Sequence, residues 1–432
     1  MTNFVFKNLK EITSRVKVGF VGPVNEFYCD KEAGVPIVRT TDIDDIDFGK
    51  LKFVTKDFHE KNKKSQVKKG DLIIARHGDN GNAVIYKHNR SAQVLNAVII
   101  EPDQSKVSSD LLKIFFDSPF IKKQIKGAVK GSVQGVINTK HISDLILNFS
   151  EAIDYDFVTK IITNLDQKIE LNYQINAKLE EMAKLIYDYW FVQFDFPDEN
   201  GKPYKSSGGK MVYNEKLDQY IPENWTISSI KEWFNSEKSG DWGKETAQNN
   251  FTLEVCCIRG TDLSGLSGEG EEKAPIRFIN KNNRDKILSN FDLVVEISGG
   301  SPTQSTGRIA AITPELQNRF QHPLVCSNFC KPISINDSDY FYNFLYLWRS
   351  FYNSGLLFKW EGKTSGIKNL LFENFVNNHK TTKPPKDIAK NFNNLISPLE
   401  EKKQFLLNEI TVLKYIRNWL LPMLMNGQVK SI

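Results

Sequence analysis

Short apolar runs, rich in β-branched residues and separated by turn residues, dominate the first hundred positions of the chain. Their length and composition are typical of strands. They predict strands at 35–38, 71–75, 83–86 and 97–100.

Helical spacing of apolar residues follows between Leu111 and Val129. We expect Ser118 and Pro119 to divide this stretch, with Ser118 as the N-cap and Pro119 as the first residue of a second helix. Strands that are followed by helices predict an α+β domain.

The same order of elements returns in the second half of the chain, with strands predicted at 255–259, 292–297, 308–312 and 325–333 and a helix at 339–356. Short sequence matches join the two halves. They are Arg39-Thr-Thr-Asp42 with Arg259-Gly-Thr-Asp262, Gly70-Asp-Leu-Ile-Ile74 with Phe291-Asp-Leu-Val-Val295, and the glycine-bounded segments 131–138 and 362–369. The offsets are 220, 221 and 231 residues, so one module is used twice and a two-part target is expected.

Two long helices with coiled-coil periodicity are predicted, one after each module. Their a and d positions are assigned to Val158, Ile161, Leu165, Lys168, Asn172, Ile175, Leu179, Met182, Ile186 and Tyr189, and to Phe392, Leu395, Leu399, Lys402, Leu406, Glu409, Leu413, Ile416, Leu420 and Met423. We expect the helices to pair antiparallel within one chain, with Pro398 and Pro422 trimming the second helix. Two alternatives fit the same pattern: pairing between chains, and helices that merely cover the cores of their own modules.

Composition limits the class of protein. No apolar run approaches the roughly 18 residues that indicate a membrane helix, and the five cysteines are an odd number. We therefore expect a cytoplasmic protein with buried thiols and no metal site, since Cys326 and Cys330 lack the paired spacing of zinc ligands. The net charge is +5, and residues 1–150 alone carry +7, with 24 Lys and Arg against 17 Asp and Glu. This balance permits binding to a polyanion without demonstrating it.

Clusters of side chains suited to DNA lie in loops of both halves. Arginine can read guanine and Asn or Gln can read adenine, while Lys, Ser and Thr hold phosphates. The candidates are Arg39, Arg76, His77, Asn80, Lys130, Ser132, Gln134, Asn138 and Lys140 in the first half, and Arg259, Gln304, Ser305, Arg308, Lys359, Lys363, Thr364, Ser365, Lys368 and Asn369 in the second.

Each of these clusters can also be explained without DNA contact. The glycine-bounded segments also fit helix ends with solvated charges, and neutral drift also explains why the Arg76 and Arg308 loops differ. Arg39 and Arg259 are identical between the halves, which favours a structural or phosphate-binding role over base discrimination. No nucleotide-binding loop, methyltransferase tetrapeptide or acid–base pair is recognisable, so we expect no catalysis by this chain.

The segment Leu179–Phe196, together with Gly201-Lys-Pro-Tyr204 and Ile221-Pro-Glu-Asn-Trp225, resembles the central helical region of specificity subunits of type I restriction-modification systems. The resemblance covers essentially the whole chain. It implies two β-rich target recognition domains, at 1–150 and 225–387, separated by spacer helices at 151–196 and 388–432, with a linker at 197–224. The expected fold class is α+β, with the two helices forming an antiparallel coiled-coil spacer.

The resemblance also implies a non-catalytic reader of double-stranded DNA. Each recognition domain would read one half of a bipartite, asymmetric site, and the chain would assemble with two methyltransferase subunits and with motor-nuclease restriction subunits. S-adenosylmethionine and ATP with Mg would belong to these partners. Aromatic residues expected at the partner interface are Tyr187, Tyr189, Trp190, Phe191 and Trp419.

Two other classes of function fit the same residues. One is a stand-alone two-headed repressor or architectural DNA-binding protein, and the other is a sugar- or peptide-binding scaffold. A steep loss of duplex affinity with salt would exclude the scaffold, because counterion release requires that loss for DNA.

Overall fold

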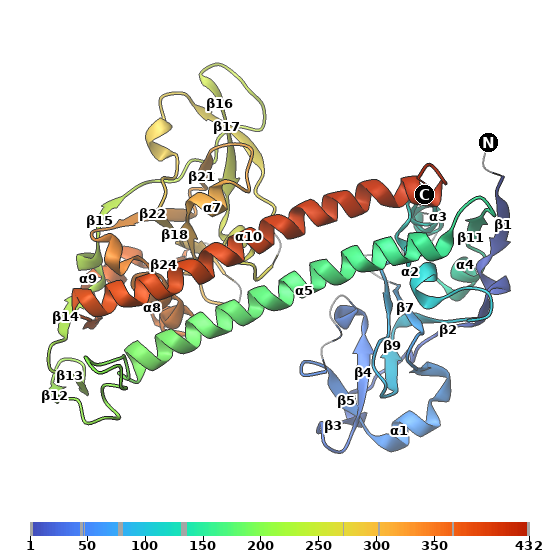
Figure 1. Ribbon diagram of the computed structural model, residues 1–432, viewed down its shortest axis with the longest axis horizontal. Helices are drawn as coiled ribbons and strands as arrows, with labels where there is room; N and C mark the ends of the chain where they lie inside the picture. Colours follow the sequence, from blue (N-terminus) through green and yellow to red (C-terminus); the bar gives the residue numbers. More distant parts are fainter. Residues whose placement is uncertain are drawn as a thin grey trace. The chain divides into compact units, whose positions relative to one another are not determined.

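The computed structural model describes residues 3–43, 46, 48–76, 81–130, 136–270, 272–300, 303–364 and 367–429. The chain folds into two compact units. Unit 1 comprises Met1–Lys168 and Leu413–Ile432, and unit 2 comprises Ile169–Val412. The long helices α5 (Tyr155–Tyr187) and α10 (Lys386–Met425) each contribute residues to both units (Figure 1).

Unit 1 is built on three sheets, with strand orders β2-β10-β7-β8, β3-β5-β4-β9-β6 and β1-β11. Most neighbouring strands are antiparallel, whereas β4 and β9 are parallel. The strands are β1 Val5–Asn8, β2 Thr13–Val18, β3 Tyr28–Cys29, β4 Val35–Arg39, β5 Lys52–Val54, β6 Gln66–Val67, β7 Leu72–Ala75, β8 Ala83–Ile85, β9 Ala92–Leu95, β10 Ala97–Pro102 and β11 Ile146–Phe149.

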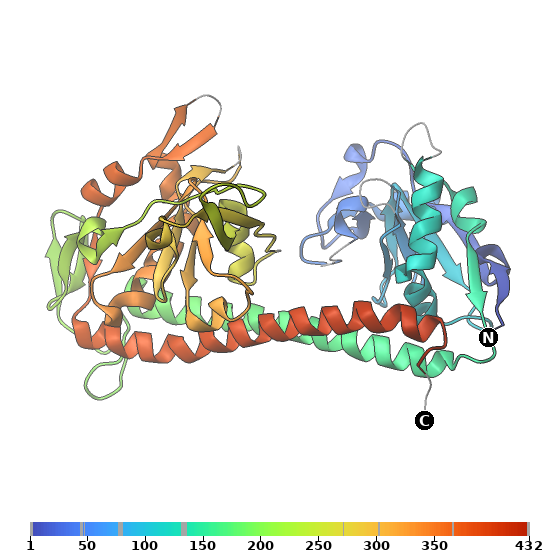
Figure 2. The ribbon, with the colours of Figure 1, turned by 90° about the horizontal axis from the view of Figure 1, so that it is seen from above.

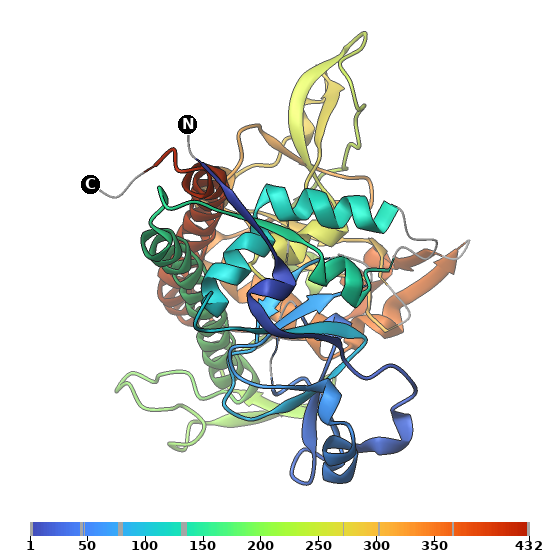
Figure 3. The same ribbon diagram turned by 90° about the vertical axis from the view of Figure 1, so that its right-hand side faces the viewer.

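The helices of unit 1 are α1 Lys56–Lys61, α2 Ser109–Asp117, α3 Pro119–Lys130 and α4 Thr139–Ser143. The predicted break at Ser118 is confirmed: its hydroxyl donates to the carbonyl of Phe115 (2.6 Å) at the end of α2 and accepts from the amide of Ile121 (3.4 Å) at the start of α3. One serine therefore caps two successive helices, which are drawn in cyan and teal in Figure 3.

Unit 2 repeats the main strands of unit 1, although β3 and β6 at the edges of one sheet have no counterpart in the corresponding sheet. Its orders β15-β22-β18-β20, β17-β16-β21 and β14-β25 match β2-β10-β7-β8, β5-β4-β9 and β1-β11, and β16 and β21 are again parallel. The predicted duplication is confirmed. The strands are β14 Thr226–Ser229, β15 Phe234–Glu237, β16 Phe251–Ile258, β17 Ile276–Asn280, β18 Asp292–Glu296, β20 Ile309–Ile312, β21 Leu324–Cys326, β22 Cys330–Ile335 and β25 Lys380–Lys383.

Unit 2 carries further strands and its own helices. A hairpin of β23 (Glu361–Thr364) and β24 (Ile367–Leu370) joins β19 (Ser298–Gly299), and it stands out from the body of unit 2 in Figure 2 (orange). The remaining elements are β12 Met211–Asn214, β13 Gln219–Pro222, α6 Leu263–Leu266, α7 Pro314–Gln317, α8 Phe341–Asn353 and α9 Phe372–Asn378.

Two predicted elements of unit 2 differ from the structure. The strand expected at 325–333 is divided, because a turn at 327–329 separates β21 from β22. The helix expected at 339–356 is confirmed only as the shorter α8. Both differences arise where apolar residues resume after a short polar turn, at Ser327-Asn328 and at Ser354-Gly355.

Helices α5 and α10 pair antiparallel, as predicted. In unit 2, the Asn172 amide donates to Glu409 (2.8 Å), and Lys403 pairs with Glu180 further along α5. In unit 1, Arg417 pairs with Asp166. The paired residue numbers rise on one helix as they fall on the other, which is the antiparallel order.

The predicted heptad register is wrong at five of its twenty positions, which are exposed. Lys168, Met182 and Tyr189 are exposed, and the helix instead buries residues one place further along at Ile162, Ile169, Asn176 and Ala183. Helix α10 behaves likewise, with Leu395 and Lys402 exposed and Ile396 and Lys403 buried. An apolar stripe wider than a two-helix seam lets either set face the partner, and packing against the rest of each unit selects the second.

The two prolines of α10 do not shorten it as predicted. Pro398 is exposed on the outer side of the helix, where water can bind the carbonyl that has lost its amide partner. Pro422 lies only three residues before the helix ends at Met425.

The largest core of unit 2 is aromatic. It gathers around the end of α5, where Asp188–Val192 widens into a π-helical turn. Phe191 packs edge-on against Phe392 of α10, with ring centroids 4.9 Å apart. Trp233 and Trp348 are almost wholly buried in the same core. The thiols of Cys256, Cys257, Cys326 and Cys330 are also buried in unit 2, as predicted.

Candidate nucleic-acid interface

Three of the predicted DNA-contacting residues of unit 2 line one pocket. Arg259 follows β16, Gln304 lies in the loop after β19, and Arg308 precedes β20. The pocket has a volume of about 710 Å³. Its other lining residues are Trp242, Gly260, Thr261, Glu296, Ser298, Gly299, Gly300, Ser327, Asn328 and Phe329. We call it the reading pocket.

Glu296 lies beneath the reading pocket and holds Arg308. The guanidinium donates through Nε (2.9 Å) and Nη2 (2.6 Å) to the two carboxylate oxygens. Glu296 is 1% exposed, and its hydrogen bonds raise the pKa of Arg308. The remaining N–H groups of Arg308 are therefore presented in a fixed orientation, as bidentate base reading requires.

Two glycines make room for this carboxylate. A Cβ added to Gly260 would lie 2.6 Å from Oε1 of Glu296, and one added to Gly299 would lie 2.5 Å from it. At the corresponding positions of unit 1, Thr40 replaces Gly260 and Ala75 replaces Glu296. Compared with unit 2, unit 1 therefore has a larger residue in place of the glycine and a smaller residue in place of the glutamate.

Arg39 and Arg259 occupy the same structural position in the two units. The Arg259 guanidinium donates to Asp262 through Nε and Nη2, both at 2.8 Å, and its backbone amide donates to the same carboxylate at 2.9 Å. Arg39 repeats the arrangement on Asp42 at 2.7–2.9 Å. In both cases the hydrogen bonds to aspartate raise the pKa of the arginine. Each arginine thus closes the turn after a strand, in agreement with a structural role.

The β23–β24 hairpin brings further candidates beside the reading pocket. Its Lys368 and Asn369 pair in the ladder with Gly299 and Ser298 of β19. Lys368 also forms an ion pair with Glu361 (3.1 Å), and its ammonium lies 3.5 Å from the carbonyl of Gln304.

The other candidates of unit 2 differ in accessibility. Lys359 is exposed on the short helix before the hairpin. Ser305 is only 3% exposed, so its hydroxyl cannot reach DNA in this conformation.

In unit 1 the structure joins two of the predicted loops. The guanidinium of Arg76 donates to the carbonyl of Ile137 (3.0 Å), and the amide of Ile137 donates to the carbonyl of Arg76 (3.2 Å). Asn138 caps α4 by accepting from the amide of His141 (2.8 Å), which leaves its NH₂ group for other contacts. Lys140 is exposed on α4.

Several candidates are not placed. His77, Asn80, Ser132, Gln134 and Ser365 lie outside the described residues, and for Lys130, Lys363 and Thr364 only the backbone is described. They stay predictions.

The backbone corrects one sequence equivalence. Arg76 corresponds to Ile297, and the carbonyl of Ile297 accepts from the amide of Leu370 (2.9 Å), as that of Arg76 accepts from Ile137. Leu370 is therefore the counterpart of Ile137, at an offset of 233 residues and not 231. Asn138 consequently corresponds to Leu371, not Asn369, because the β-hairpin has gained length after the glycine.

Two aromatic residues of the reading pocket were not among the predicted contacts. Trp242 is 37% exposed and stacks on the guanidinium of Arg277 at 4.2 Å, while Phe329 is 57% exposed. Phe329 was assigned to a strand and lies instead in the turn between β21 and β22. The sequence did contain a signal for this turn, because Phe329 follows Ser-Asn, a pair that favours turns.

The predicted partner-interface residues separate into two groups. Tyr187 and Phe191 are buried in the core of unit 2, so they hold the fold together and do not form a surface. Trp190 is half-buried. Tyr189 and Trp419 are 39% and 53% exposed.

Tyr189 belongs to an outward-facing row on α5 and the π-helical turn that follows. Met182, Leu185, Tyr189 and Val192 are spaced by three, four and three residues and are 49%, 59%, 39% and 58% exposed. Such a row is typical of a helix face that packs against another protein. We call it the α5 stripe.

Comparison with known proteins shows which proteins this chain resembles. Residues 3–181 match the family model for the type I restriction modification DNA specificity domain. The chain is 23% identical over 367 residues to the MjaIX specificity subunit of Methanocaldococcus jannaschii, covering 84% of this chain and 78% of that protein. It is 32% identical over 138 residues to the HindI specificity subunit of Haemophilus influenzae, covering 31% of this chain and 30% of that protein.

The fold resembles a solved structure over nearly its whole length. The S subunit of a type I restriction-modification system from M. genitalium superposes with a TM-score of 0.57 at 12% identity, covering 98% of this chain and 96% of that one. Within the described ranges, no helix combines the length and the apolar character needed to cross a membrane.

Proposed function

We propose that this chain is a member of the family of specificity subunits of type I restriction-modification systems, which it resembles in sequence and fold, and that it reads a bipartite, asymmetric duplex site, with one half-site per unit. Reading requires donors and acceptors held at fixed positions on a rigid frame. The duplicated sheets supply the frame, and the loops that differ between the units supply the chemistry.

The observation that carries the proposal is the convergence of Arg259, Gln304 and Arg308 on one pocket of unit 2. Arg308 is oriented by a buried carboxylate, whereas Gln304 is exposed. We assign base reading to Gln304 and Arg308. Arg259 is occupied by Asp262 and supports the backbone of the site.

Unit 1 is proposed to read the other half-site through Arg76 and the NH₂ group of Asn138. The excess positive charge of residues 1–150, at +7, favours contact with phosphates there. Lys140, exposed beside Asn138, is the described lysine placed to supply one such contact.

The α5 stripe is proposed as a contact for a methyltransferase subunit. Four exposed apolar side chains in one row cost solubility unless a partner covers them. The chemistry of methylation and cleavage would then belong to partner subunits, with S-adenosylmethionine, ATP and Mg bound there and restriction subunits joining the same assembly. A cytoplasmic location follows from this role.

The proposal is tested by methylome mapping. We would co-express the chain with a cognate methyltransferase subunit and map methylated adenines by single-molecule sequencing. A two-part motif is expected. Gln304→Ala should relax one base of one half and leave the other half unchanged, at a cost of about 1–3 kcal/mol for the contacted base.

Gln219→Ala is the matched control, because Gln219 is another exposed glutamine of unit 2, on β13. It should leave the motif intact. A motif unchanged by Gln304→Ala would remove base reading from this pocket. Tight, sequence-specific binding by the purified chain, with no methylated motif in the host, would favour the stand-alone repressor.

A further inference from the structure

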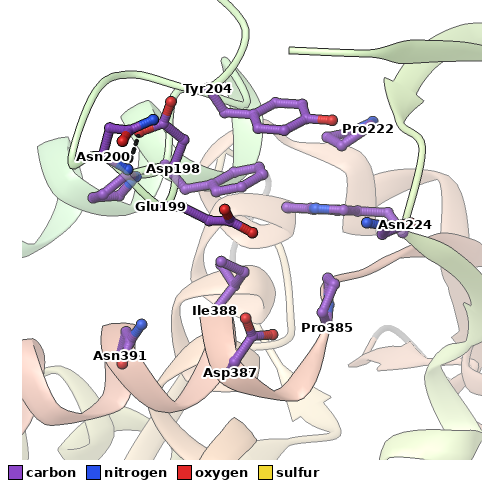
Figure 4. A pocket seen from close by; sticks show the side chains of 13 residues that line it. Asp198, Glu199, Asn200, Tyr204, Pro222, Asn224, Pro385, Asp387, Ile388 and Asn391 are labelled. Atoms are coloured by element: carbon purple, nitrogen blue, oxygen red, sulfur yellow. Dashed lines mark hydrogen bonds between the residues drawn. The ribbon is translucent and has the colours of Figure 1, made fainter.

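A second pocket of unit 2 has the opposite electrostatic character to the reading pocket. It lies where the loop after α5 meets the start of α10, and its volume is about 680 Å³ (Figure 4). Its lining includes three carboxylates, Asp198, Glu199 and Asp387, and neither lysine nor arginine is among the described lining residues. DNA phosphates would be repelled here. We call it the acidic pocket.

A stack of three aromatic rings forms one wall of the acidic pocket. Tyr204 lies 4.7 Å from Phe196, and Phe196 lies 5.6 Å from Trp225, with nearly parallel planes in both cases. Trp225 is 6% exposed. These rings join the wall of the pocket to the core of unit 2.

The indole N–H of Trp225 lacks a hydrogen-bond acceptor among the described residues, although the side chain lines the pocket. A buried donor without a partner costs about 1–3 kcal/mol. An acceptor oxygen delivered by a ligand would recover this free energy. A carbonyl group suits a neutral indole donor and is compatible with carboxylates nearby.

Glu199 and Asp387 are the carboxylates able to bind a cation. Both are exposed, and within the described chain neither takes part in an ion pair. Figure 4 shows their carboxyl groups facing the hollow from the loop and from α10. The adjacent Lys386 is directed elsewhere, because it pairs with Asp337 at 2.7 Å.

Asp198 has a different task. Its carboxylate accepts from the backbone amides of Asn200 and Lys202, both at 2.8 Å. It therefore fixes the loop that presents Glu199.

We propose that the acidic pocket binds an extended segment of another protein that carries an arginine side chain. The guanidinium bridges the carboxylates of Glu199 and Asp387, and a backbone carbonyl of the segment accepts from the indole of Trp225. Arginine fits better than lysine, since its planar fork offers five N–H donors to two carboxylates and also stacks on aromatic rings. A polyamine offers no acceptor for the indole, whereas a peptide offers both groups.

The proposal is independent of DNA reading, and the full-length chain tests it directly. The probe is acetyl-Gly-Arg-Gly-amide, titrated into protein with ¹⁵N-labelled tryptophan while the indole cross-peaks are followed. The Trp225 peak is assigned by Trp225→Phe. We expect this peak to shift with saturation, and affinity to fall at least tenfold in Glu199→Gln/Asp387→Asn. Both substitutions are at exposed positions and leave the core intact.

Two control ligands separate the parts of the proposal. Acetyl-Gly-Gln-Gly-amide keeps the carbonyls without the charge and should bind at least tenfold more weakly. Agmatine keeps the guanidinium without a peptide and should leave the Trp225 peak in place. If the glutamine peptide bound equally well, charge recognition would be overturned. If agmatine shifted the Trp225 peak equally, the assignment of a peptide ligand would be overturned. If the affinity were unchanged in Trp225→Phe, the indole contact would be overturned.

Discussion

Arg308, just before β20, and Glu296, at the end of the neighbouring strand β18, form a two-point ion pair at 2.6 and 2.9 Å beneath the reading pocket. Glu296 is 1% exposed, and the side chain of Arg308 is 14% exposed. A carboxylate this deeply buried depends on its partner, because burial without compensation is costly. The same pair of side chains therefore stabilises unit 2 and orients the arginine that is proposed to read a base.

Glu296→Gln should destabilise unit 2 by about 3 kcal/mol, because it leaves the buried guanidinium without its counter-charge. Hydrogen exchange of unit 2 amides as denaturant rises would measure the loss. The apolar double variant Glu296→Leu/Arg308→Met is the control, since it removes both charges at similar volume. If the single variant were no less stable than the double variant, the ion pair would have no structural role.

Asn176→Leu should stabilise the helix pair by about 1–3 kcal/mol. Asn176 is 4% exposed in the seam, and its amide has no hydrogen-bond partner among the described residues. Thermal unfolding followed by circular dichroism would show the rise. Asn172→Leu is the matched comparison. Asn172 donates to Glu409 (2.8 Å), so its replacement should lower stability; a gain in both variants would mean that side-chain volume alone controls the seam.

Acid should weaken unit 2 through Glu400. Burial alone would raise the pKa of Glu400, but the positive charges of Lys403 and Arg349 outweigh it and lower the pKa to about 2. A carboxyl group with a folded pKa below its unfolded value of 4.5 stabilises the protein above pH 4.5. This stabilisation is lost as the pH falls toward 2.

The test compares the denaturant midpoint of the wild type with that of Glu400→Gln at several pH values. At pH 7 the variant should be less stable by about 3–5 kcal/mol, as for other broken buried pairs. The difference should shrink steadily below pH 4.5. A difference that stayed constant down to pH 3 would mean that the Glu400 charge is not coupled to folding.

One thiol should react rapidly in the folded chain. Burial raises the pKa of Cys257 and Cys330 to about 12, raises that of Cys326 well above its usual range, and raises that of Cys256. Thiolate, the reactive form, is therefore scarce at these sites at pH 8. Cys29 is half-buried in unit 1. A thiol-exchange dye should label one site quickly and four only after unfolding, and Cys29→Ser should remove the fast phase.

Much of the architecture was predictable because its signals are local. The Ser118-Pro119 helix break follows from capping chemistry, and the matched residues at Arg39 and Arg259 indicate the duplication from the sequence alone. These features need only a few adjacent residues. Their physical causes act within one turn of the chain.

Features that depend on distant packing were not predictable. The heptad register was wrong at positions such as Met182, since the next residue, Ala183, is also apolar and only contacts elsewhere decide which of the two is buried. Phe329 joined the reading pocket because β21 ends at a turn inside an apolar run. The Glu296–Arg308 pair was also missed, since nothing in either loop reveals which strand lies beneath it.

Gly260 and Glu296 of unit 2 are replaced by Thr40 and Ala75 in unit 1. This difference limits how such a chain can diversify by recombination. A genetic crossover between the two halves that fell within 260–296 would place a threonine against a glutamate, or leave a glycine opposite an alanine. The first product is crowded against a carboxylate that Arg308 holds in place, and the second is underpacked. Viable recombinants should therefore inherit this interval as a single block, with breakpoints confined to its flanks.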